Sequence, residues 1–441
     1  MLIQPARRLR GRLRLPGDKS ISHRAAILSA LAEGPAHIAN FSTSEDCAST
    51  LACLGGLGVS IERAGASVRL AGVGLDGLSQ PLRALDCGNS GSTMRMLAGV
   101  LAGQSFVSEL TGDHSLRSRP MKRISEPLEL MGARLESNAG RAPLRITGRQ
   151  PLKSIVYEMP VASAQVKSCL MLAGLLAEGR TEITERGGPT RDHTERLLGW
   201  LGVRVEEAEQ QDGDISSTVF AVEGLKNFEA RDLKIPGDIS SAAFFLVAAA
   251  LLSGSDLTIE DVGLNPTRAQ VVWTMQKLGF DVRTDKMREE CNEPVGTIRI
   301  RGSEGFMRPA AEGTAILCGP QIPQLIDELP VLAVVGTQVE GGLVIREAAE
   351  LRVKETDRIA ATAANLRAMG ARVEEYRDGL AVDGPIRLRG ARLDSHGDHR
   401  IVMAFTVAAL VAEGASEMDG AECVGVSFPE FFQLLETVVE R

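Results

Sequence analysis

The residues with the clearest chemical potential lie at 16–24, which read PGDKSISHR and lead into an apolar run. Pro-Gly-Asp ends a strand, and Asp18 or Ser20 can cap the helix that follows, so its first backbone amides face outward as hydrogen-bond donors. Lys19, Ser20 and Arg24 add an ammonium, a hydroxyl and a guanidinium beside those amides. The stretch indicates an anion-binding site, although a capped helix with a solvated basic first turn would carry the same residues.

Four more stretches in the first half place basic or hydroxyl side chains at turns or at the start of a helix. Small residues let the backbone approach a ligand closely, and cations at a helix N-terminus are disfavoured by the dipole unless an anion lies nearby. The stretches are residues 86–95 (DCGNSGSTMR), 113–120 (DHSLRSRP), 163–168 (SAQVKS) and 191–196 (RDHTER). Each is weak alone, because tight turns and solvated basic loops have the same composition.

Carboxylates are the prominent candidates in the second half. Asp327 precedes a buried run and is either a helix cap or a general base. Residues 352–358 (RVKETDR) crowd three cations and two acids before a long helix, where an exposed face of ion pairs is the alternative. Residues 396–400 (HGDHR) raise the question of zinc, but no third group of ligands has suitable spacing, so we expect no metal.

The first of these stretches has a second copy. Residues 235–241 (IPGDISS) again precede an apolar run, and Pro236 lies 220 residues after Pro16 in a chain of 441. Two halves that begin alike imply duplicated domains. Ile239 stands where the first copy has Lys19, so the first copy is interpreted as the working one. The expected domains are residues 1–18 together with 236–441, and residues 19–235.

A shorter repeat lies inside both halves. An apolar helix, a glycine and a strand recur at residues 51–61, 128–135, 197–205, 275–282 and 366–373. The glycine is the expected end of each helix. Residues 428–439 are expected to form a sixth helix without its glycine. Six units, three per half, predict an α/β repeat architecture.

Composition limits the class of protein. The net charge of −8 argues against nucleic acid as a partner, and the longest apolar runs are too short to span a bilayer. Seven cysteines without a CxxC pair or a secretory signal are typical of reduced thiols in a cytoplasmic protein.

Together, six motifs resemble those of the 5-enolpyruvylshikimate-3-phosphate synthase family. They are PGDKSISHR at 16–24, GNSGSTMR at 88–95, SRP at 118–120, SAQVK at 163–167, RVKETDR at 352–358 and GDHR at 397–400. The resemblance implies an α/β fold of two similar domains, each of three βαβαββ repeats in an inside-out α/β barrel, with the active site in the interdomain cleft. It implies transfer of the enolpyruvyl group of phosphoenolpyruvate to the 5-hydroxyl of shikimate 3-phosphate, without metal or organic cofactor, in a cytoplasmic monomer.

The resemblance also implies a role for each matching residue. The residues implied to bind shikimate 3-phosphate are Lys19, Ser20, Arg24, Ser163, Ala164, Gln165, Arg191, Asp327 and Lys354. Those implied to bind phosphoenolpyruvate are Lys19, Asn89, Gly91, Arg119, Gln165, Arg358 and Arg400. Asp327 would accept the hydroxyl proton, and Glu355 with Lys19 would protonate the enol carbon. Two phosphates and two carboxylates among the substrates account for so many cations.

Two positions depart from common family patterns. Val426 stands where many members carry a lysine that contacts phosphoenolpyruvate. The first-motif GDKS, SAQVK, RDHTE and NPTR sequences match the glyphosate-tolerant subclass, yet Gly91 stands where well-known tolerant members have alanine. Glyphosate is the expected competitive inhibitor, and the two signals conflict about its strength.

Two other functions compete with this interpretation. The sister transferase family acts on UDP-N-acetylglucosamine, but its members usually pair lysine with asparagine in the first motif and carry a loop cysteine, whereas Lys19 precedes Ser20 here and residues 113–120 contain no cysteine. A non-catalytic anion-binding scaffold is the second alternative. The presence of both Asp327 and Glu355 argues against it.

Overall fold

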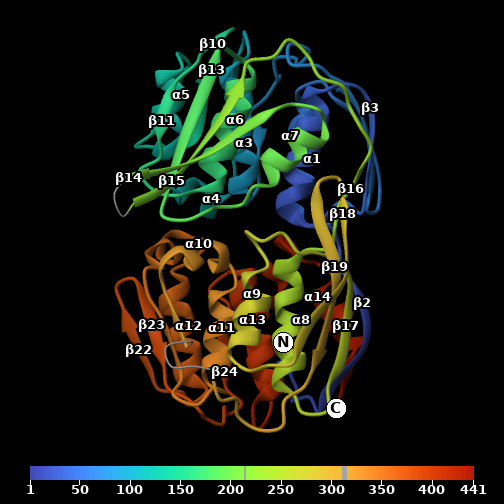
Figure 1. The fold of residues 1–441 in the computed structure, drawn as a ribbon, viewed down its shortest axis with the longest axis vertical. Helices are drawn as coiled ribbons and strands as arrows, with labels where there is room; N and C mark the ends of the chain where they lie inside the picture. Colours follow the sequence, from blue (N-terminus) through green and yellow to red (C-terminus); the bar gives the residue numbers. More distant parts are fainter. Residues whose placement is uncertain (213–214, 310–314) are drawn as a thin grey trace. The chain divides into compact units, whose positions relative to one another are not determined.

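The computed structural model describes residues 1–212, 215–309 and 315–441. The chain forms two compact units, coloured along the sequence in Figure 1. Unit 1 contains residues 1–16, 236–289 and 294–441, and unit 2 contains residues 17–235 and 290–293. Each unit has its own apolar core.

The helices of unit 2 are α1 (Lys19–Leu31), α2 (Glu45–Gly56), α3 (Gly91–Ala102), α4 (His114–Ser118), α5 (Lys122–Leu130), α6 (Ala164–Leu175) and α7 (His193–Trp200). Its strands are β3 (Glu33–Ala39), β4 (Ser60–Ala64), β5 (Ser67–Val73), β6 (Leu85–Asp86), β7 (Val107–Thr111), β8 (Arg134–Asn138), β9 (Arg141–Thr147), β10 (Leu152–Lys153), β11 (Val156–Glu158), β12 (Ala177–Glu178), β13 (Arg180–Arg186), β14 (Val205–Asp212), β15 (Ile215–Glu223) and β16 (Leu233–Lys234).

The helices of unit 1 are α8 (Ile239–Leu251), α9 (Gln270–Lys277), α10 (Ile322–Leu325), α11 (Leu329–Gly336), α12 (Arg358–Ala368), α13 (His399–Val411) and α14 (Phe431–Glu436), with short 3₁₀ turns η1 (Gly319–Gln321), η2 (Ala349–Val353) and η3 (Ala421–Val426). Its strands are β1 (Leu2–Ile3), β2 (Arg8–Arg14), β17 (Asp256–Gly263), β18 (Val282–Glu290), β19 (Glu293–Arg301), β20 (Ile316–Leu317), β21 (Leu343–Ile345), β22 (Val373–Tyr376), β23 (Gly379–Val382), β24 (Arg392–Asp394), β25 (Ser416–Asp419) and β26 (Val439–Glu440).

The same sheet pattern recurs through both units. In the sheet β6-β7-β9-β8, β6 and β7 are parallel, and β9 pairs antiparallel with both β7 and β8. The sheets β11-β13-β15-β14 and β20-β21-β23-β22 repeat this order. A helix connects the parallel strands of each, because parallel neighbours need a crossover connection. The predicted α/β fold with βαβαββ repeats is confirmed.

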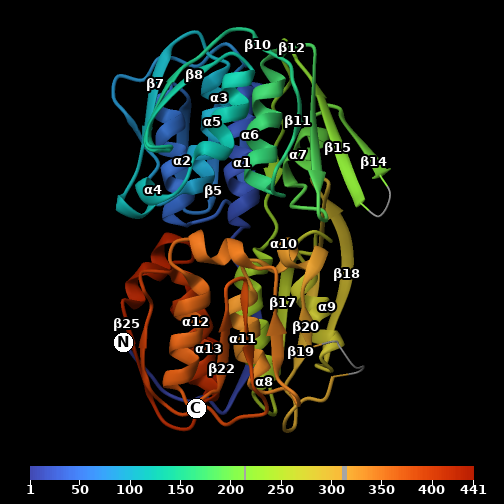
Figure 2. The ribbon, with the colours of Figure 1, turned by 90° about the vertical axis from the view of Figure 1, so that its left-hand side faces the viewer.

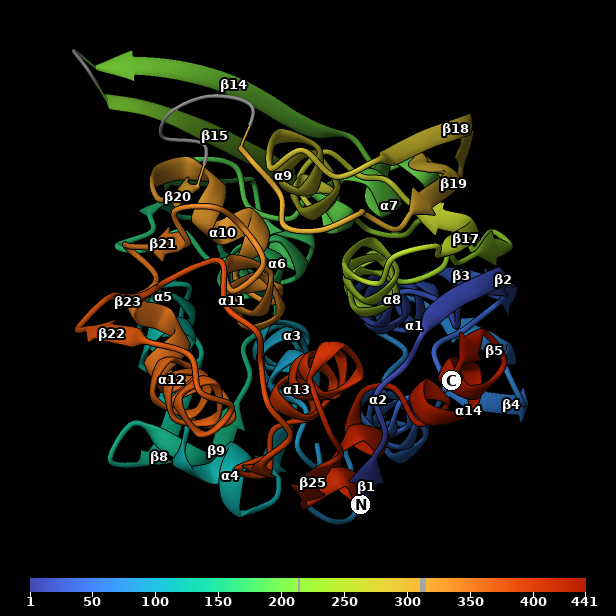
Figure 3. The ribbon, with the colours of Figure 1, turned by 90° about the horizontal axis from the view of Figure 1, so that it is seen from below.

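Each unit places its most apolar helices inside and its sheets outside. Figure 2 shows α1, α3 and α6 of unit 2, and α3 contacts both of the others. Figure 3 shows α8, α11 and α13 in the middle of unit 1, contacting one another, with strands towards the outside. These helices are buried nearly all round, which is the expected fate of a helix that is apolar on every face. Their first residues therefore stand at the end of a rigid core.

The five predicted helix–glycine–strand junctions are all present. Each has a glycine with positive φ just beyond the helix, where the amide of the next residue donates to a carbonyl in the last helical turn, as Val59 does to Leu54. This is a Schellman motif, which a side chain at the glycine would strain. The five glycines are Gly58, Gly132, Gly202, Gly279 and Gly370.

The predicted sixth helix at 428–439 is wrong in extent. Helix α14 covers only Phe431–Glu436, and the chain then enters β26, which pairs with β2. The corresponding sheet has the order β1-β25-β24, so its third strand comes from the N-terminus of the chain. Pairing with an element far away in the sequence overrode the local helical pattern.

The domain boundaries also differ in detail from the prediction. Unit 2 begins at Gly17, two residues earlier than predicted, because Gly17 packs against the Asn40 carbonyl, where a Cβ atom would be only 1.7 Å from the oxygen. Residues 290–293 belong to unit 2, because Glu293 bonds His193 and the Cys291 thiol accepts the amide of Lys234. No helix in the described parts of the chain is long and apolar enough to cross a membrane.

Candidate functional site

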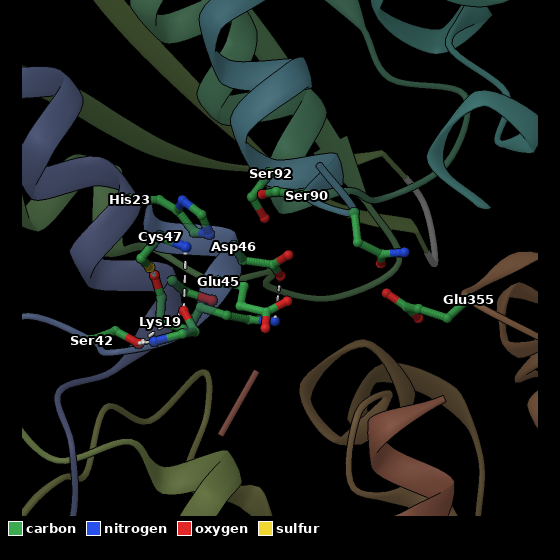
Figure 4. Close-up of polar contacts among 12 residues, drawn as sticks. Lys19, His23, Ser42, Glu45, Asp46, Cys47, Ser90, Ser92 and Glu355 are labelled. Carbon is green, nitrogen blue, oxygen red and sulfur yellow. Dashed lines mark hydrogen bonds and ion pairs between the residues drawn. The ribbon is translucent and has the colours of Figure 1, made fainter. Parts of the chain in front are cut away.

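The N-terminus of α1 carries the first set of candidates. Asp18 caps the helix by accepting the Ile21 amide at 2.9 Å, so the cap is Asp18 and not Ser20. The Lys19 ammonium lies 2.9 Å from Asp46 of α2, and Figure 4 shows both side chains among the neighbouring polar groups. Asp238 caps α8 in the same way in the second copy, where Ile239 replaces the lysine. Both copies build the turn, but only the first presents an ammonium beside it.

Arg24 is a buried cation held by neutral acceptors. Its guanidinium donates to the Thr194 hydroxyl, the Ser168 hydroxyl and the Ser20 carbonyl, each at 2.8 Å. Arg191 donates to the Ser20 hydroxyl at 3.1 Å. Burial, and after it the positive charge of Arg191, lowers the pKa of Arg24 to about 10. A bound anion would relieve both costs, so this pair suits a phosphate or carboxylate.

A second cationic group, Arg119 directly after α4, contacts the loop before α3. Arg119 donates to Asn89 at 2.7 Å and to the Ser115 hydroxyl at 3.1 Å, and Asn89 in turn donates to Asp113 at 2.7 Å. These contacts fix Arg119, which is buried, beside the start of α3.

Gln165 and Gly91 meet at a third arginine. Gln165 accepts from Arg95 at 2.6 Å and donates to Ser92 at 2.9 Å. A Cβ on Gly91 would lie 2.6 Å from the Arg95 Nη1 atom. Ser163 and Ala164 begin α6 directly before Gln165. The absent side chain at Gly91 therefore lets Arg95 reach Gln165.

In unit 1 one arginine gathers both candidate catalytic carboxylates. Arg358 donates to Glu355 at 2.6 Å and to Asp327 at 3.3 Å, and its Nε donates to Asp398 at 2.8 Å. Arg358 is 1% exposed, whereas the Asp327 and Glu355 side chains are 13% and 19% exposed. The two carboxylates are therefore more accessible than the buried guanidinium that holds them. Burial alone would lower the pKa of Arg358, but the charges of Asp398, Glu355 and Asp327 raise it above its usual value.

Arg400 and Lys354 complete the candidates of unit 1. Arg400, at the start of α13, donates to the Asp327 carbonyl at 3.0 Å, and its guanidinium lies 3.6 Å from the Asp327 carboxylate. Lys354 lies at the end of η2 and donates to Glu350 at 2.7 Å, apart from the Arg358 group. Unit 1 thus offers both candidate carboxylates together with three cations, whereas the charged candidates of unit 2, Lys19, Arg24, Arg119 and Arg191, are all cations.

Several residues that hold these groups were missed from the sequence. Asp46 partners Lys19, Thr194 and Ser168 hold Arg24, and Arg95 holds Gln165. Asp398 lies inside the GDHR motif, where it binds Arg358 and caps α13. Arg95, Ser168, Thr194 and Asp398 carried a signal, because each lies within one of the candidate stretches, whereas Asp46 is a single acidic residue on an ordinary helix.

No group of three His, Cys, Asp or Glu side chains within the described residues is arranged to hold a metal ion. Asp398, the acid between the two histidines of residues 396–399, is instead committed to Arg358.

Comparisons with known proteins agree with one another. The chain matches the family described as EPSP synthase (3-phosphoshikimate 1-carboxyvinyltransferase) over residues 3–435. It is 49% identical to the 3-phosphoshikimate 1-carboxyvinyltransferase of a Synechococcus species, covering 100% of this chain and 96% of that protein. It is 51% identical to the protein of the same name from Pelotomaculum thermopropionicum, covering 98% and 97%.

Solved structures give the same picture. An EPSP synthase from Acinetobacter baumannii has a TM-score of 0.84 and 40% identity, covering 99% of this chain and 98% of that one. The enolpyruvyl transferase NikO from Streptomyces tendae has a TM-score of 0.74 at 17% identity, covering 100% and 97%, which shows a shared fold alone.

Proposed function

The chain belongs to the EPSP synthase family, and from that membership we propose how its own residues carry out the reaction. It transfers the enolpyruvyl group of phosphoenolpyruvate to the 5-hydroxyl of shikimate 3-phosphate and releases phosphate, as a transferase of the shikimate pathway. The observation that carries the mechanism is the contact of both Asp327 and Glu355 with the one buried guanidinium of Arg358.

In the addition step, Asp327 accepts the proton of the 5-hydroxyl while the oxygen of that hydroxyl bonds to C2 of phosphoenolpyruvate. Glu355, assisted by Lys19, delivers a proton to the methylene carbon, and a tetrahedral adduct results. In the elimination step Glu355 takes a proton back from that carbon, Asp327 returns its proton to the departing phosphate as the C2–O bond breaks, and the enol ether forms. The buried Arg358 supports these two steps because it orients both carboxylates.

The remaining candidates bind the anionic groups of the two substrates. We propose that Ser20, Arg24, Ser163, Ala164, Gln165, Arg191 and Lys354 hold shikimate 3-phosphate with Lys19 and Asp327, and that Asn89, Gly91, Arg119, Arg358 and Arg400 hold phosphoenolpyruvate with Lys19 and Gln165. Support comes from the mutually repelling Arg24 and Arg191, whose charges a phosphate would neutralise. We propose further that glyphosate competes with phosphoenolpyruvate and that the enzyme works as a cytoplasmic monomer.

Phosphate release tests the function. The purified protein is assayed with phosphoenolpyruvate and either shikimate 3-phosphate or UDP-N-acetylglucosamine, with and without chelator. We expect release only with shikimate 3-phosphate and no effect of the chelator. Release only with the sugar nucleotide would contradict the proposal, and release with neither acceptor would favour a binding scaffold.

Three variants test the mechanism. Asp327→Asn and Glu355→Gln are each expected to lower kcat by about 10²–10⁴-fold, the usual contribution of a positioned acid or base. Glu340→Gln is the matched control, because Glu340 forms an exposed ion pair with Arg308. Equal activity of the Asp327 variant and the control would remove Asp327 from its role.

A further inference from the structure

Unit 2 contains a buried, hydrogen-bonded chain of polar side chains separate from the residues proposed to bind the substrates. His23 of α1, Thr50 of α2, Thr93 of α3 and Ser90, the N-cap of α3, are connected in series and are fully buried. His23 Nδ1 lies 2.7 Å from the Thr50 hydroxyl, which lies 2.6 Å from the Thr93 hydroxyl. Thr93 donates to the Ser90 hydroxyl at 2.7 Å.

The donors in this chain follow one direction. Since the Thr93 hydroxyl proton goes to Ser90, the Thr50 hydroxyl must donate to Thr93, and the proton between His23 and Thr50 then comes from Nδ1. His23 Nε2 is therefore the unprotonated nitrogen, and it has no hydrogen-bond partner in the described part of the chain. Burial, followed by the charges of Lys19 and Arg24, lowers the pKa of His23 well below 6.5, so the imidazole is neutral.

This hydrogen-bonded chain connects α1, α2 and the start of α3, which carry candidate ligands of phosphoenolpyruvate or the partners of those ligands. Helix α1 begins at Lys19, and α2 presents Asp46 to that lysine. The Thr93 hydroxyl also lies 3.4 Å from the Asp46 carbonyl, and the Ser90 hydroxyl accepts the Thr93 amide at 3.1 Å. Asn89 and Gly91 flank Ser90 in the sequence. Figure 4 shows His23, Asp46 and Ser90 in this region.

The second half of the chain shows that the fold does not need this polar chain. The residue 220 positions after His23 is Ala243, on α8, where it is buried in the apolar core of unit 1. That half has also lost the lysine, since Ile239 replaces Lys19. An apolar residue thus suffices for helix packing, and a histidine is present only in the half with the ammonium. Hydrogen bonds fix a relative position that apolar contacts leave adjustable.

We propose that His23, Thr50, Thr93 and Ser90 are positioning residues that hold the start of α3, with Asn89 and Gly91, at the distance from Lys19 that phosphoenolpyruvate requires. They act through those residues and do not touch the substrate. The inference rests on the proposed function, and it makes the affinity for phosphoenolpyruvate, but not that for shikimate 3-phosphate, depend on the chain. Arg24 is held separately by Thr194 and Ser168.

Thr93→Val tests the inference, because valine keeps the shape and removes the central hydroxyl. We expect KM for phosphoenolpyruvate to rise about tenfold, equivalent to about 1.4 kcal/mol, with kcat and KM for shikimate 3-phosphate changed less than about twofold. Thr93→Ser restores the hydroxyl and is expected to restore KM. The matched control is Thr181→Val, because Thr181 is buried in the same unit and its hydroxyl has no hydrogen-bond partner among the described residues.

The outcomes separate the two proposals. If the unaltered protein has no activity with shikimate 3-phosphate, the proposed function fails and the inference fails with it. If it is active but Thr93→Val leaves KM for phosphoenolpyruvate unchanged, or raises both KM values equally, only the inference fails. Circular dichroism compares the folding of the variants. If Thr93→Val does not fold, the same KM measurements on Thr50→Val, which removes the link from α2, test the inference.

A spectroscopic measurement tests the chain without activity. Imidazole ¹⁵N spectra, with the His23 signal assigned from its absence in His23→Asn, should show a neutral ring with its proton on Nδ1. A proton on Nε2 in the unaltered protein would contradict the donor direction on which the inference depends.

Discussion

The Arg358–Asp398 pair gives the sharpest test of how unit 1 supports its carboxylates. Asp398→Asn keeps the volume of the side chain and an oxygen that can still accept the Arg400 amide, but it removes the charge that faces Arg358. Arg358 and Asp398 are 1% and 0% exposed, so solvent cannot replace the lost partner.

Removing one partner of a buried ion pair usually costs about 3–5 kcal/mol. Glu355 and Asp327 still contact Arg358 in the variant, so we expect a loss near the lower limit, about 3 kcal/mol, in the free energy of unfolding of unit 1. With a denaturant slope of about 2 kcal/mol per M urea, the unfolding midpoint falls by about 1.5 M. A fall in kcat should accompany it, because the guanidinium that orients both carboxylates is released.

The two tryptophans allow unit 1 to be observed alone. Trp273 lies on α9 of unit 1 and Trp200 on α7 of unit 2, so fluorescence in a Trp200→Phe background reports unit 1. The matched control is Asp419→Asn, which breaks the exposed pair with Arg392 and should change little. A midpoint for Asp398→Asn equal to that of the control would refute the reasoning that burial makes this pair important.

Three other predictions follow from the same geometry. Gly91→Ala should displace Arg95 from Gln165, because the new Cβ would lie 2.6 Å from Arg95 Nη1. In steady-state assays we expect higher values of both KM for phosphoenolpyruvate and the glyphosate inhibition constant. Unchanged constants would show that Arg95 moves without consequence. Val426→Lys, at the end of η3, should lower KM for phosphoenolpyruvate if the family's lysine contact can form here, and an unchanged KM would show that the remaining cations suffice. Burial, followed by the charges of Lys19 and Arg24, lowers the pKa of His23, so His23 stays neutral in the folded protein but binds a proton in the unfolded chain below pH 6.5. Its contribution to stability is therefore complete above pH 6.5. As the pH falls below 6.5, we expect the free energy of unfolding to decrease by about 1.4 kcal/mol per pH unit. Urea unfolding of unit 2 between pH 7 and 5, followed through Trp200 in a Trp273→Phe background, checks this, and His23→Asn should flatten the profile.

Local patterns predicted the repeated architecture well. The junctions at Gly58, Gly132, Gly202, Gly279 and Gly370 could be recognised because a helix that ends on a left-handed residue needs glycine whatever surrounds it. The cap of α1 was predicted only as Asp18 or Ser20, and the structure assigns it to Asp18, which accepts the amide three residues on. The extent of α14 could not be predicted, because β26 forms only through its pairing with β2, some 430 positions away.

The sequence by itself determined the duplicated halves, the repeat, the family and the types of residue that bind anions and transfer protons, because these depend on short motifs with fixed spacing. Only the tertiary structure decided what holds those residues in place. It paired Lys19 with Asp46, surrounded Arg24 with Thr194 and Ser168, and set both candidate catalytic carboxylates on Arg358 above Asp398. Apart from Glu355, which lies three residues from Arg358, these partners lie 27 to 170 residues apart in the chain. Hydrogen bonds over such separations exist only after the helices that carry them have packed.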